Sequence, residues 1–396
     1  MIASLFHIFN PPSIAVRVAN DDTTFDPLSY PNLNILTTGK VHGKIKIVHS
    51  AVDDSKVGLI STRVWIAKEN DKEEVAVQTG FENKTFTFTI EGPNRFSSFS
   101  IYHETTIQIP HACEYMGNLR IDAPNTSLSS DALDNLQWDK VHVRLSSNAV
   151  AFQSLRADSI NIRTSNSSIA GAFDAGNISL DTTNGAITAK LVVREPKDGR
   201  QSQVMIETSN AHVNLHVDAT PTTSGLWMES KNKNGRIALG TLLGPATMGS
   251  YIGAVNENGI IDFSLDASQT GQPLDVYNKT MNGNVVSSIM VPHQQPFKGH
   301  VQNMNGSIAV NLTEEFRGQF TLETLNSSTT VEGSDLRFDQ DETNNKSGLH
   351  GKGLSEIKMV TMNAPANLRF YREGESLAAD SKMEHQTGSR RQWRST

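Results

Sequence analysis

The chain has 396 residues, 37% hydrophobic and 19% charged, which fits a folded protein with a large core better than a disordered chain. Its formal net charge is −7, from 42 acidic and 35 basic residues. No basic stripe dominates, so no nucleic-acid partner is expected. The single cysteine, Cys113, excludes an intrachain disulfide and a cysteine-based zinc site. A run of about 18 apolar residues is absent, so no transmembrane segment is predicted.

The N-terminal region carries few structural signals. Residues 1–40 are rich in Pro, Asn and Asp and are expected to be poorly ordered. The first nine residues are apolar, but they lack a positive start and precede Asn10-Pro11-Pro12, so they are not a convincing secretion signal. Alternating patterns then begin, as in Phe86 and Phe88 between threonines. Residues 41–115 are therefore predicted to be a β-strand lead-in that caps the next segment.

From residue 116 onward, one turn phrase recurs, as in Thr182-Thr-Asn-Gly185 and Thr280-Met-Asn-Gly283. With the asparagine as position zero, apolar or small residues fall at −6, −4 and −2, and again at +3, +5 and +7. A period of two on both sides of the turn predicts strand, corner and strand in every repeat.

The repeated corners define the predicted fold. Successive anchors are 18 to 26 residues apart until the last, which follows after 37, and Ser147 replaces the asparagine once. A sandwich has no reason to repeat one phrase in one register, whereas stacked coils do. The sequence predicts an all-β, parallel β-helix-like β-solenoid of about ten coils over residues 116–371, on the order of 50 Å long. The predicted turn ladder consists of Asn125, Asn166, Asn184, Asn210, Asn234, Asn258, Asn282, Asn305, Asn326 and Asn363.

Two roles were considered for the repeated asparagine. A tight corner favours positive φ, which Gly adopts freely and Asn tolerates, and stacked Asn side chains can hydrogen-bond along the stack. A repeated ligand-binding asparagine is the alternative. Asn-Gly also occurs in two-residue antiparallel hairpins, so a plain meander stays open at this stage.

Three segments interrupt or follow the repeats. Residues 194–202 are polar and predict a loop, and the polar insertion 333–353 predicts a surface excursion. Residues 372–396, with a basic end, predict a disordered tail. The segment after Asn363 is expected to cap the far end of the stack, because open strand edges need covering.

Candidate chemistry is sparse. The −3 positions Asp122, Arg144, Arg163, Asp181 and Glu207 alternate in sign, which predicts a solvated, paired face rather than an acid–base site. His212 and His216 would lie about 13 Å apart on one strand face, too far for one metal. Phosphate-binding, dinucleotide-binding and nucleophile-elbow motifs are absent. We therefore predict no catalytic, cofactor-binding or metal site and no enzyme activity.

One column of the repeat changes character along the chain. The −1 position is polar in early coils and apolar in late ones. Such a ridge is either covered, by the 333–353 insertion or the N-terminal segment, or available to a partner. The candidate partner stripe consists of Met281, Met304, Leu325 and Met362.

The segments of the chain follow a recognisable order. Paired strands come first, then Thr105-Thr-Ile-Gln-Ile-Pro110, and then the Thr-x-Asn-Gly-x-Ile coils. Over residues 40–371 this order resembles the putative adhesin family of unknown function, widespread in bacteria, and its fungal relatives. The resemblance implies a β-helix-like solenoid at a cell surface or outside the cell, and it supplies no catalytic residues. A surface protein is expected to carry a clear secretion signal, and the weak signal in this chain departs from that expectation.

The sequence supports three functional hypotheses. The first is a non-enzymatic structural or adhesive module whose partner, a protein or a glycan, is unknown. The second is a glycan-binding or glycan-active solenoid like the pectin lyases, which would need converging carboxylates on one face. The third is an intracellular scaffold. Nine Asn-x-Ser/Thr sequons, including Asn83, would allow N-glycosylation if the chain is exported.

Overall fold

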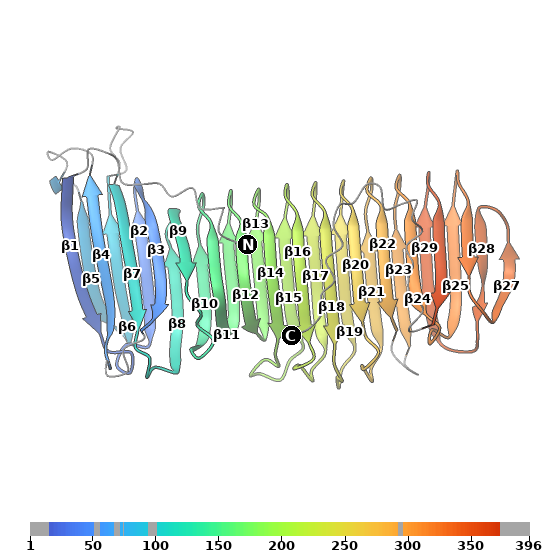
Figure 1. Ribbon diagram of the computed structural model, residues 1–396, viewed down its shortest axis with the longest axis horizontal. Helices are drawn as coiled ribbons and strands as arrows, with labels where there is room; N and C mark the ends of the chain where they lie inside the picture. The colour runs from blue at the N-terminus through green and yellow to red at the C-terminus, as the bar shows by residue number, and fades with distance from the viewer. Residues whose placement is uncertain are drawn as a thin grey trace.

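The computed structural model describes residues 16–50, 56–66, 72–73, 75–93, 101–291 and 296–372. These residues form a long stack of β-coils in which almost every strand lies beside its equivalent in the next coil (Figure 1). The predicted all-β solenoid is confirmed. Within the described residues, no helix is long and apolar enough to cross a membrane.

Each central coil consists of two strands joined by the asparagine corner. In one coil, β15 (Ser202–Thr208) precedes the corner at Asn210 and β16 (Val213–Ala219) follows it. Both strands alternate buried and exposed residues, so Val204 and Val213 face the interior. β-branched residues at every second position favour this pleated, half-buried geometry.

Stacking these coils produces two facing sheets of parallel strands. In the first sheet, the strands before the corners pair in order, and in the second sheet the strands after the corners pair in the same order. The first sheet contains β8 (Tyr115–Asp122), β10 (Gln137–Arg144), β13 (Asn177–Thr182), β15, β17 (Leu226–Asn232), β19 (Ser250–Asn256), β21 (Leu274–Lys279) and β23 (Phe297–Gln302). The second contains β9 (Asn125–Ser130), β12 (Ile169–Ala175), β14 (Ile187–Val193), β16, β18 (Ile237–Leu243), β20 (Ile261–Asp266), β22 (Val285–Met290) and β24 (Ile308–Thr313). The long strand β11 (Val150–Thr164) begins in the second sheet and ends in the first.

The N-terminal end is more ordered than the sequence indicated. It contains β1 (Val16–Phe25), β2 (Asn32–Thr38), β3 (Val41–His49), β4 (Gly58–Ile66), β5 (Ala76–Glu82), β6 (Thr85–Glu91) and β7 (Ile101–Ile109). β2 and β3 form a coil between the β6–β7 and β8–β9 coils, and antiparallel strands β5, β4 and β1 cover the outer edges. The expectation of poor order in residues 1–40 is wrong for 16–38, because Leu33 and Ile35 alternate into the core.

The C-terminal end contains β25 (Gly318–Thr324), β26 (Thr329–Glu332), β27 (Leu336–Asp341), β28 (Asn345–His350), β29 (Ser355–Thr361) and β30 (Ala366–Tyr371). The β29–β30 coil inserts between the β23–β24 and β25–β26 coils, and the β28–β27 hairpin pairs antiparallel with the edge of β25 (Figure 1). The 333–353 segment is therefore an edge hairpin rather than a surface excursion, and the segment after Asn363 is an internal strand rather than the cap. A charged, antiparallel hairpin stops further strand addition, which accounts for its polar composition. The predicted tail lies outside the described residues, apart from Arg372.

Candidate functional site

The asparagine corners form a continuous side-chain ladder along one edge of the stack. Each amide Nδ2 donates to Oδ1 of the asparagine in the neighbouring coil, over 2.6–2.8 Å. The order in space is Asn166, Asn184, Asn210, Asn234, Asn258, Asn282, Asn305, Asn363 and Asn326. Because every member between the end residues Asn166 and Asn326 both donates and accepts, the column is occupied by its own members rather than offered to a ligand.

Asn125 lies outside this run. Two coils separate it from Asn184 along the first sheet, and the serine corner at Ser147 lies between it and Asn166. Its backbone carbonyl accepts a hydrogen bond from Nδ2 of Asn148 over 2.7 Å. The serine corner therefore separates Asn125 from the rest of the ladder.

A second, buried ladder of Thr and Asn side chains lies two residues before each ladder asparagine from Asn184 onward, whereas the Thr164 hydroxyl is buried without a hydrogen-bond partner among the described residues. Asn256 donates from Nδ2 to the carbonyl of Gly235 over 2.5 Å, and its Oδ1 accepts from the amide of Gly259 over 3.2 Å. Thr280 repeats both bonds one coil later. These positions belong to the inward-facing set of the repeat, but they carry Thr or Asn rather than apolar side chains. Their hydrogen bonds satisfy corner backbone groups that would otherwise be buried and unpaired.

The glycine after the asparagine has a different role from the one expected. Among the described residues, positive φ occurs at positions such as Gly39 and Gly225 and not at the ladder asparagines or the glycines that follow them. A Cβ on Gly259 would lie 1.9 Å from the carbonyl oxygen of Gly235. A Cβ on Gly283 would lie 2.0 Å from that of Gly259. The prediction of a positive φ was wrong, and close approach between coils is what requires glycine here.

The apolar ridge lies beside the ladder, one residue before each asparagine. The insertion of β29 between β23 and β25 places Met362 between Met304 and Leu325, as the backbone bonds from Met362 to Met304 and from Asn326 to Met362 indicate. The exposed fractions are 41% for Met281, 40% for Met304, 39% for Met362 and 64% for Leu325. The 333–353 hairpin leaves all four side chains exposed.

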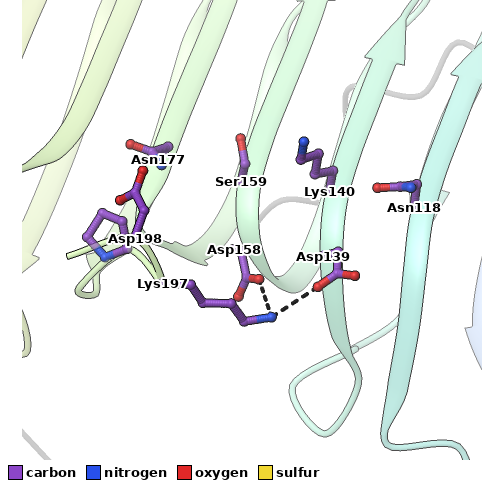
Figure 2. Close-up of a pocket in the computed structure, with 9 residues that line it drawn as sticks. Asn118, Asp139, Lys140, Asp158, Ser159, Asn177, Lys197 and Asp198 are labelled. Carbon is purple, nitrogen blue, oxygen red and sulfur yellow. Dashed lines mark hydrogen bonds and ion pairs between the residues drawn. The ribbon is translucent and has the colours of Figure 1, made fainter. Parts of the chain in front are cut away.

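The outer face of the first sheet carries a polar groove of about 410 Å³. Figure 2 shows Asn118, Lys140, Ser159 and Asn177 in a row along neighbouring strands. Lys197, from the loop between β14 and β15, lies beside this row, next to Asp139 and Asp158. Its Nζ lies 3.0 Å from Oδ1 of Asp139 and 2.5 Å from Oδ2 of Asp158.

Aligned irregularities in the strands place these two carboxylates side by side. Pairing of β10 with β8 and β11 passes from Trp138 directly to Lys140 without a change of register, so Gly117, Asp139 and Asp158 are left unpaired at the same level of three strands. The alternation of inward and outward side chains slips by one residue at this level, because Trp138 and Val141 are both buried. Asp139 and Lys140 therefore both reach the outer surface, although they are adjacent in sequence.

The carboxylates of this groove are already hydrogen-bonded. Tyr115 donates its hydroxyl to Asp139, and Gln137 donates from Nε2 to Oδ1 of Asp158 over 3.0 Å. Partial burial would raise the pKa of Asp139, but hydrogen bonds from Tyr115 and Lys197 outweigh it and lower that pKa. Hydrogen bonds to Asp158 and Asp139 raise the pKa of Lys197. The cluster is an ion-pair network held in its charged form.

A second groove of about 290 Å³ lies further along the same face. Tyr251, Tyr277 and His300 line it from three successive strands, together with charged residues of β21, β23 and β29. Trp227 continues the aromatic row into β17 and stacks on Tyr251, with ring centroids 5.9 Å apart. Tyr277 and His300 stack similarly, 5.5 Å apart.

The remaining residues singled out by sequence are dispersed. Arg163 pairs with Asp181 over 2.7 Å within the charged −3 column. The Cys113 thiol donates to the carbonyl of Tyr115 over 3.2 Å, and burial raises its pKa, which is unfavourable for a nucleophile. No cluster of three metal-binding side chains occurs within the described ranges.

Both grooves escaped the sequence analysis, although their register was available. Asp139 and Asp158 both lie eight residues before their corners at 147 and 166. Trp227 and Tyr251 both lie seven before Asn234 and Asn258. Tyr277 and His300 both lie five before Asn282 and Asn305, so the aromatic residues occupy two neighbouring outward columns of the repeat. The loop that supplies Lys197 carries no such signal.

Comparison with known proteins gives similarities of low sequence identity. Neither a protein-family model nor a curated protein matches the chain. Similar solved structures include a "putative cell adhesion protein" from Clostridium sporogenes (9% identity, 89% of this chain and 100% of that chain, TM-score 0.17). A "putative adhesin" from Bacteroides fragilis has 12% identity and a TM-score of 0.34, and the match covers 68% of this chain and 97% of that chain. A "putative adhesin" from Parabacteroides distasonis has 11% identity and a TM-score of 0.31, and the match covers 89% of this chain and 97% of that chain.

Proposed function

We propose that this chain is a non-enzymatic, adhesin-like module that holds a partner at a cell surface against the outer face of its first sheet. The observation that carries the proposal is that both grooves lie on this one face. Each groove crosses several consecutive coils, so an elongated partner could contact many strands at once. Binding of that kind needs a broad, fixed surface rather than a deep cavity.

The rigidity of the stack supports this role. Every central corner is fixed by the exposed asparagine ladder, the buried Thr/Asn ladder and backbone bonds between coils. Side chains on such a face keep their spacing before a partner arrives. A preorganised face loses less conformational entropy on binding than a flexible one.

The chemistry of the polar groove favours binding over catalysis. A general acid needs a raised pKa and a free proton, whereas Asp139 has a lowered pKa and accepts bonds from Tyr115 and Lys197. Asp158 is occupied by Lys197 and Gln137. The second candidate, a glycan-active enzyme, would have to break this network before either carboxylate could act.

Binding of the labelled chain to intact bacterial and fungal cells, and to isolated cell-wall polymers, tests the proposal. A first-sheet variant, Lys298→Glu with Lys358→Glu, should lose most binding, because both side chains line a groove. A second-sheet variant, Lys190→Glu with Arg369→Glu, changes the charge equally and should bind normally. No binding to any surface, or equal loss in both variants, would contradict the proposal.

The cellular location needs a separate test. A C-terminally tagged chain expressed in a eukaryotic host should be exported and shift on a gel after enzymatic deglycosylation. Asn83 is the favoured acceptor because it is exposed in the β5–β6 turn, whereas the sequon residue Asn278 is fully buried. Retention of an unmodified chain in the cytoplasm would favour the intracellular-scaffold alternative. Asn83→Gln should remove the shift.

A further inference from the structure

Four partly exposed aromatic side chains of the first sheet form a row on its outer face. Trp227, Tyr251, Tyr277 and His300 come from β17, β19, β21 and β23, which are consecutive in the stack. Trp227 pairs with Tyr251, and Tyr277 pairs with His300, but Tyr277 lies opposite Gly253, so the second pair is offset from the first by two residues along the strands. The row therefore crosses three strand spacings, on the order of 14 Å, at an oblique angle. Each side chain is partly exposed, so the rings are accessible although they also contact the sheet.

At least one ring lies along the sheet instead of standing on it. A Cβ on Gly253 would meet Oη of Tyr251 at 2.8 Å and Cε1 at 3.2 Å, so the ring extends over the glycine two residues further along β19. The near-parallel Trp227 ring, at 20° to Tyr251, adopts a similar tilt. Gly253 therefore leaves room for the Tyr251 ring, and the Trp227–Tyr251 and Tyr277–His300 pairs each stack, with interplanar angles of 20° and 30°.

The groove beside the row contains charged side chains of both signs, all of which can form hydrogen bonds. Asp275, Glu356, Lys298 and Lys358 line it, so the groove has no charge of one sign that would select an ionic ligand. Nε2 of His300 is buried and has no hydrogen-bond partner among the described residues. Burial, and then the nearby Lys358, lower the pKa of His300, which favours a neutral ring. A buried polar atom without a partner is costly unless a ligand or water satisfies it.

From this arrangement we infer that the Trp227–His300 row binds a neutral, extended β-linked glycan chain. Pyranose rings with all-equatorial substituents expose axial C–H groups on both faces, and these pack on aromatic ring faces. Their hydroxyl groups would meet Asp275, Lys298 and His300. The inference rests on the proposed function and names the ligand class for the same face.

Isothermal titration of the purified full chain with cellohexaose and chitohexaose tests the inference, with maltohexaose as an α-linked comparison. We expect binding of a β-linked hexasaccharide, about tenfold weaker in Trp227→Ala and in Tyr251→Ala. Trp227→Phe should retain most affinity because it keeps a ring. Met205→Ala is the matched control, since Met205 lies exposed on the neighbouring strand β15 outside the row. Melting temperatures of all four variants are measured alongside.

The outcomes separate this inference from the proposed function. Absence of binding to both β-linked sugars, or binding that Trp227→Ala leaves unchanged, overturns the glycan inference. If Trp227→Ala nevertheless binds cell surfaces like the unaltered chain, the adhesive function stands with a different contact. If the unaltered chain binds neither sugars nor cells, both proposals fail.

Discussion

Asn326 donates a hydrogen bond from Nδ2 to Oδ1 of Asn363 over 2.7 Å, although 37 residues separate them. Asn363 in turn donates to Asn305 over 2.7 Å. The order of the coils in space therefore differs from their order in the sequence. The β25–β26 coil and the β27–β28 hairpin precede β29–β30 in the chain, but β29–β30 lies between the β23–β24 and β25–β26 coils. A similar insertion occurs at the other end, where the β2–β3 coil lies between the β6–β7 and β8–β9 coils. Both ends are thereby locked by segments that are distant in sequence.

Removing residues 355–396 should disrupt more than one coil. In a stack built serially, such a truncation would remove only the last level. Here it leaves β23 and β25 without their shared neighbour β29, so β25, β26 and the hairpin should lose their order. Limited proteolysis should then cleave between 314 and 354. Asn363→Ala, which keeps β29, is the control and should stay resistant; resistance of the truncated chain would contradict the predicted dependence.

The two ladders should differ in energetic value within a single coil. Asn258→Ala removes exposed amide bonds and should cost about 1 kcal/mol. Asn256→Ala leaves the Gly259 amide and the Gly235 carbonyl unsatisfied in a buried corner, and should cost about 3 kcal/mol. Urea denaturation measures both. Equal losses would mean that burial does not distinguish the ladders.

Gly259→Ala should destabilise the stack by about 2 kcal/mol, because its Cβ would collide with the Gly235 carbonyl of the neighbouring coil. Gly271→Ala is the matched control, since no atom lies within 4 Å of the Cβ it would add. The control should be neutral in the same denaturation experiment. If Gly259→Ala were also neutral, the corners would have more freedom than their spacing indicates.

The repeat predicted the coils well because each coil places the same residue types in the same environment. The pattern around Asn210 is reproduced by buried Val204, Ile206 and Val213. Corner conformation was less accessible to sequence reasoning. Asn-Gly is compatible with a positive φ, and only the neighbouring backbone reveals that space is limiting.

Spatial order at the ends could not be obtained from local pattern. Nothing within residues 355–371 indicates that they pair between β23 and β25, because every parallel neighbour in the stack offers equivalent backbone groups. The bridging lysine illustrates the same limit. Lys197 contacts Asp139, 58 residues away, through a loop without periodicity. The two carboxylates themselves follow the repeat and could have been found.

His103 should make the N-terminal end sensitive to acid. It is fully buried, its ring nitrogens contact the hydroxyls of Thr105 and Thr126 at 3.0 and 3.1 Å, and burial lowers its pKa to about 3. Histidine in the unfolded chain takes up a proton near pH 6.5, whereas His103 in the folded chain stays neutral down to about pH 3. The free energy of unfolding therefore decreases as the pH falls from about 6.5 towards 3.

The expected loss from His103 between pH 7 and pH 5 is about 2 kcal/mol. His103→Gln should reduce this loss by a similar amount, even if it lowers stability at pH 7. His212→Gln, at an exposed position, should leave the pH dependence unchanged. Urea denaturation at the two pH values provides the measurement. An unchanged slope in His103→Gln would exclude His103 as its source.

The apolar ridge of Met281, Met304, Met362 and Leu325 stays a predicted partner stripe. If the ridge is accessible, Met281→Ser with Met304→Ser should cost only about 1 kcal/mol per site, because both side chains are already about 40% exposed. Met228→Ser, at a fully buried position, is the matched comparison and should cost about 4 kcal/mol. A partner that uses the ridge would bind the double variant poorly despite its near-normal melting temperature. A drop in melting temperature as large as that of Met228→Ser would instead indicate that the ridge is covered within the folded chain. If the double variant bound the partner normally, the ridge would be excluded as a contact surface.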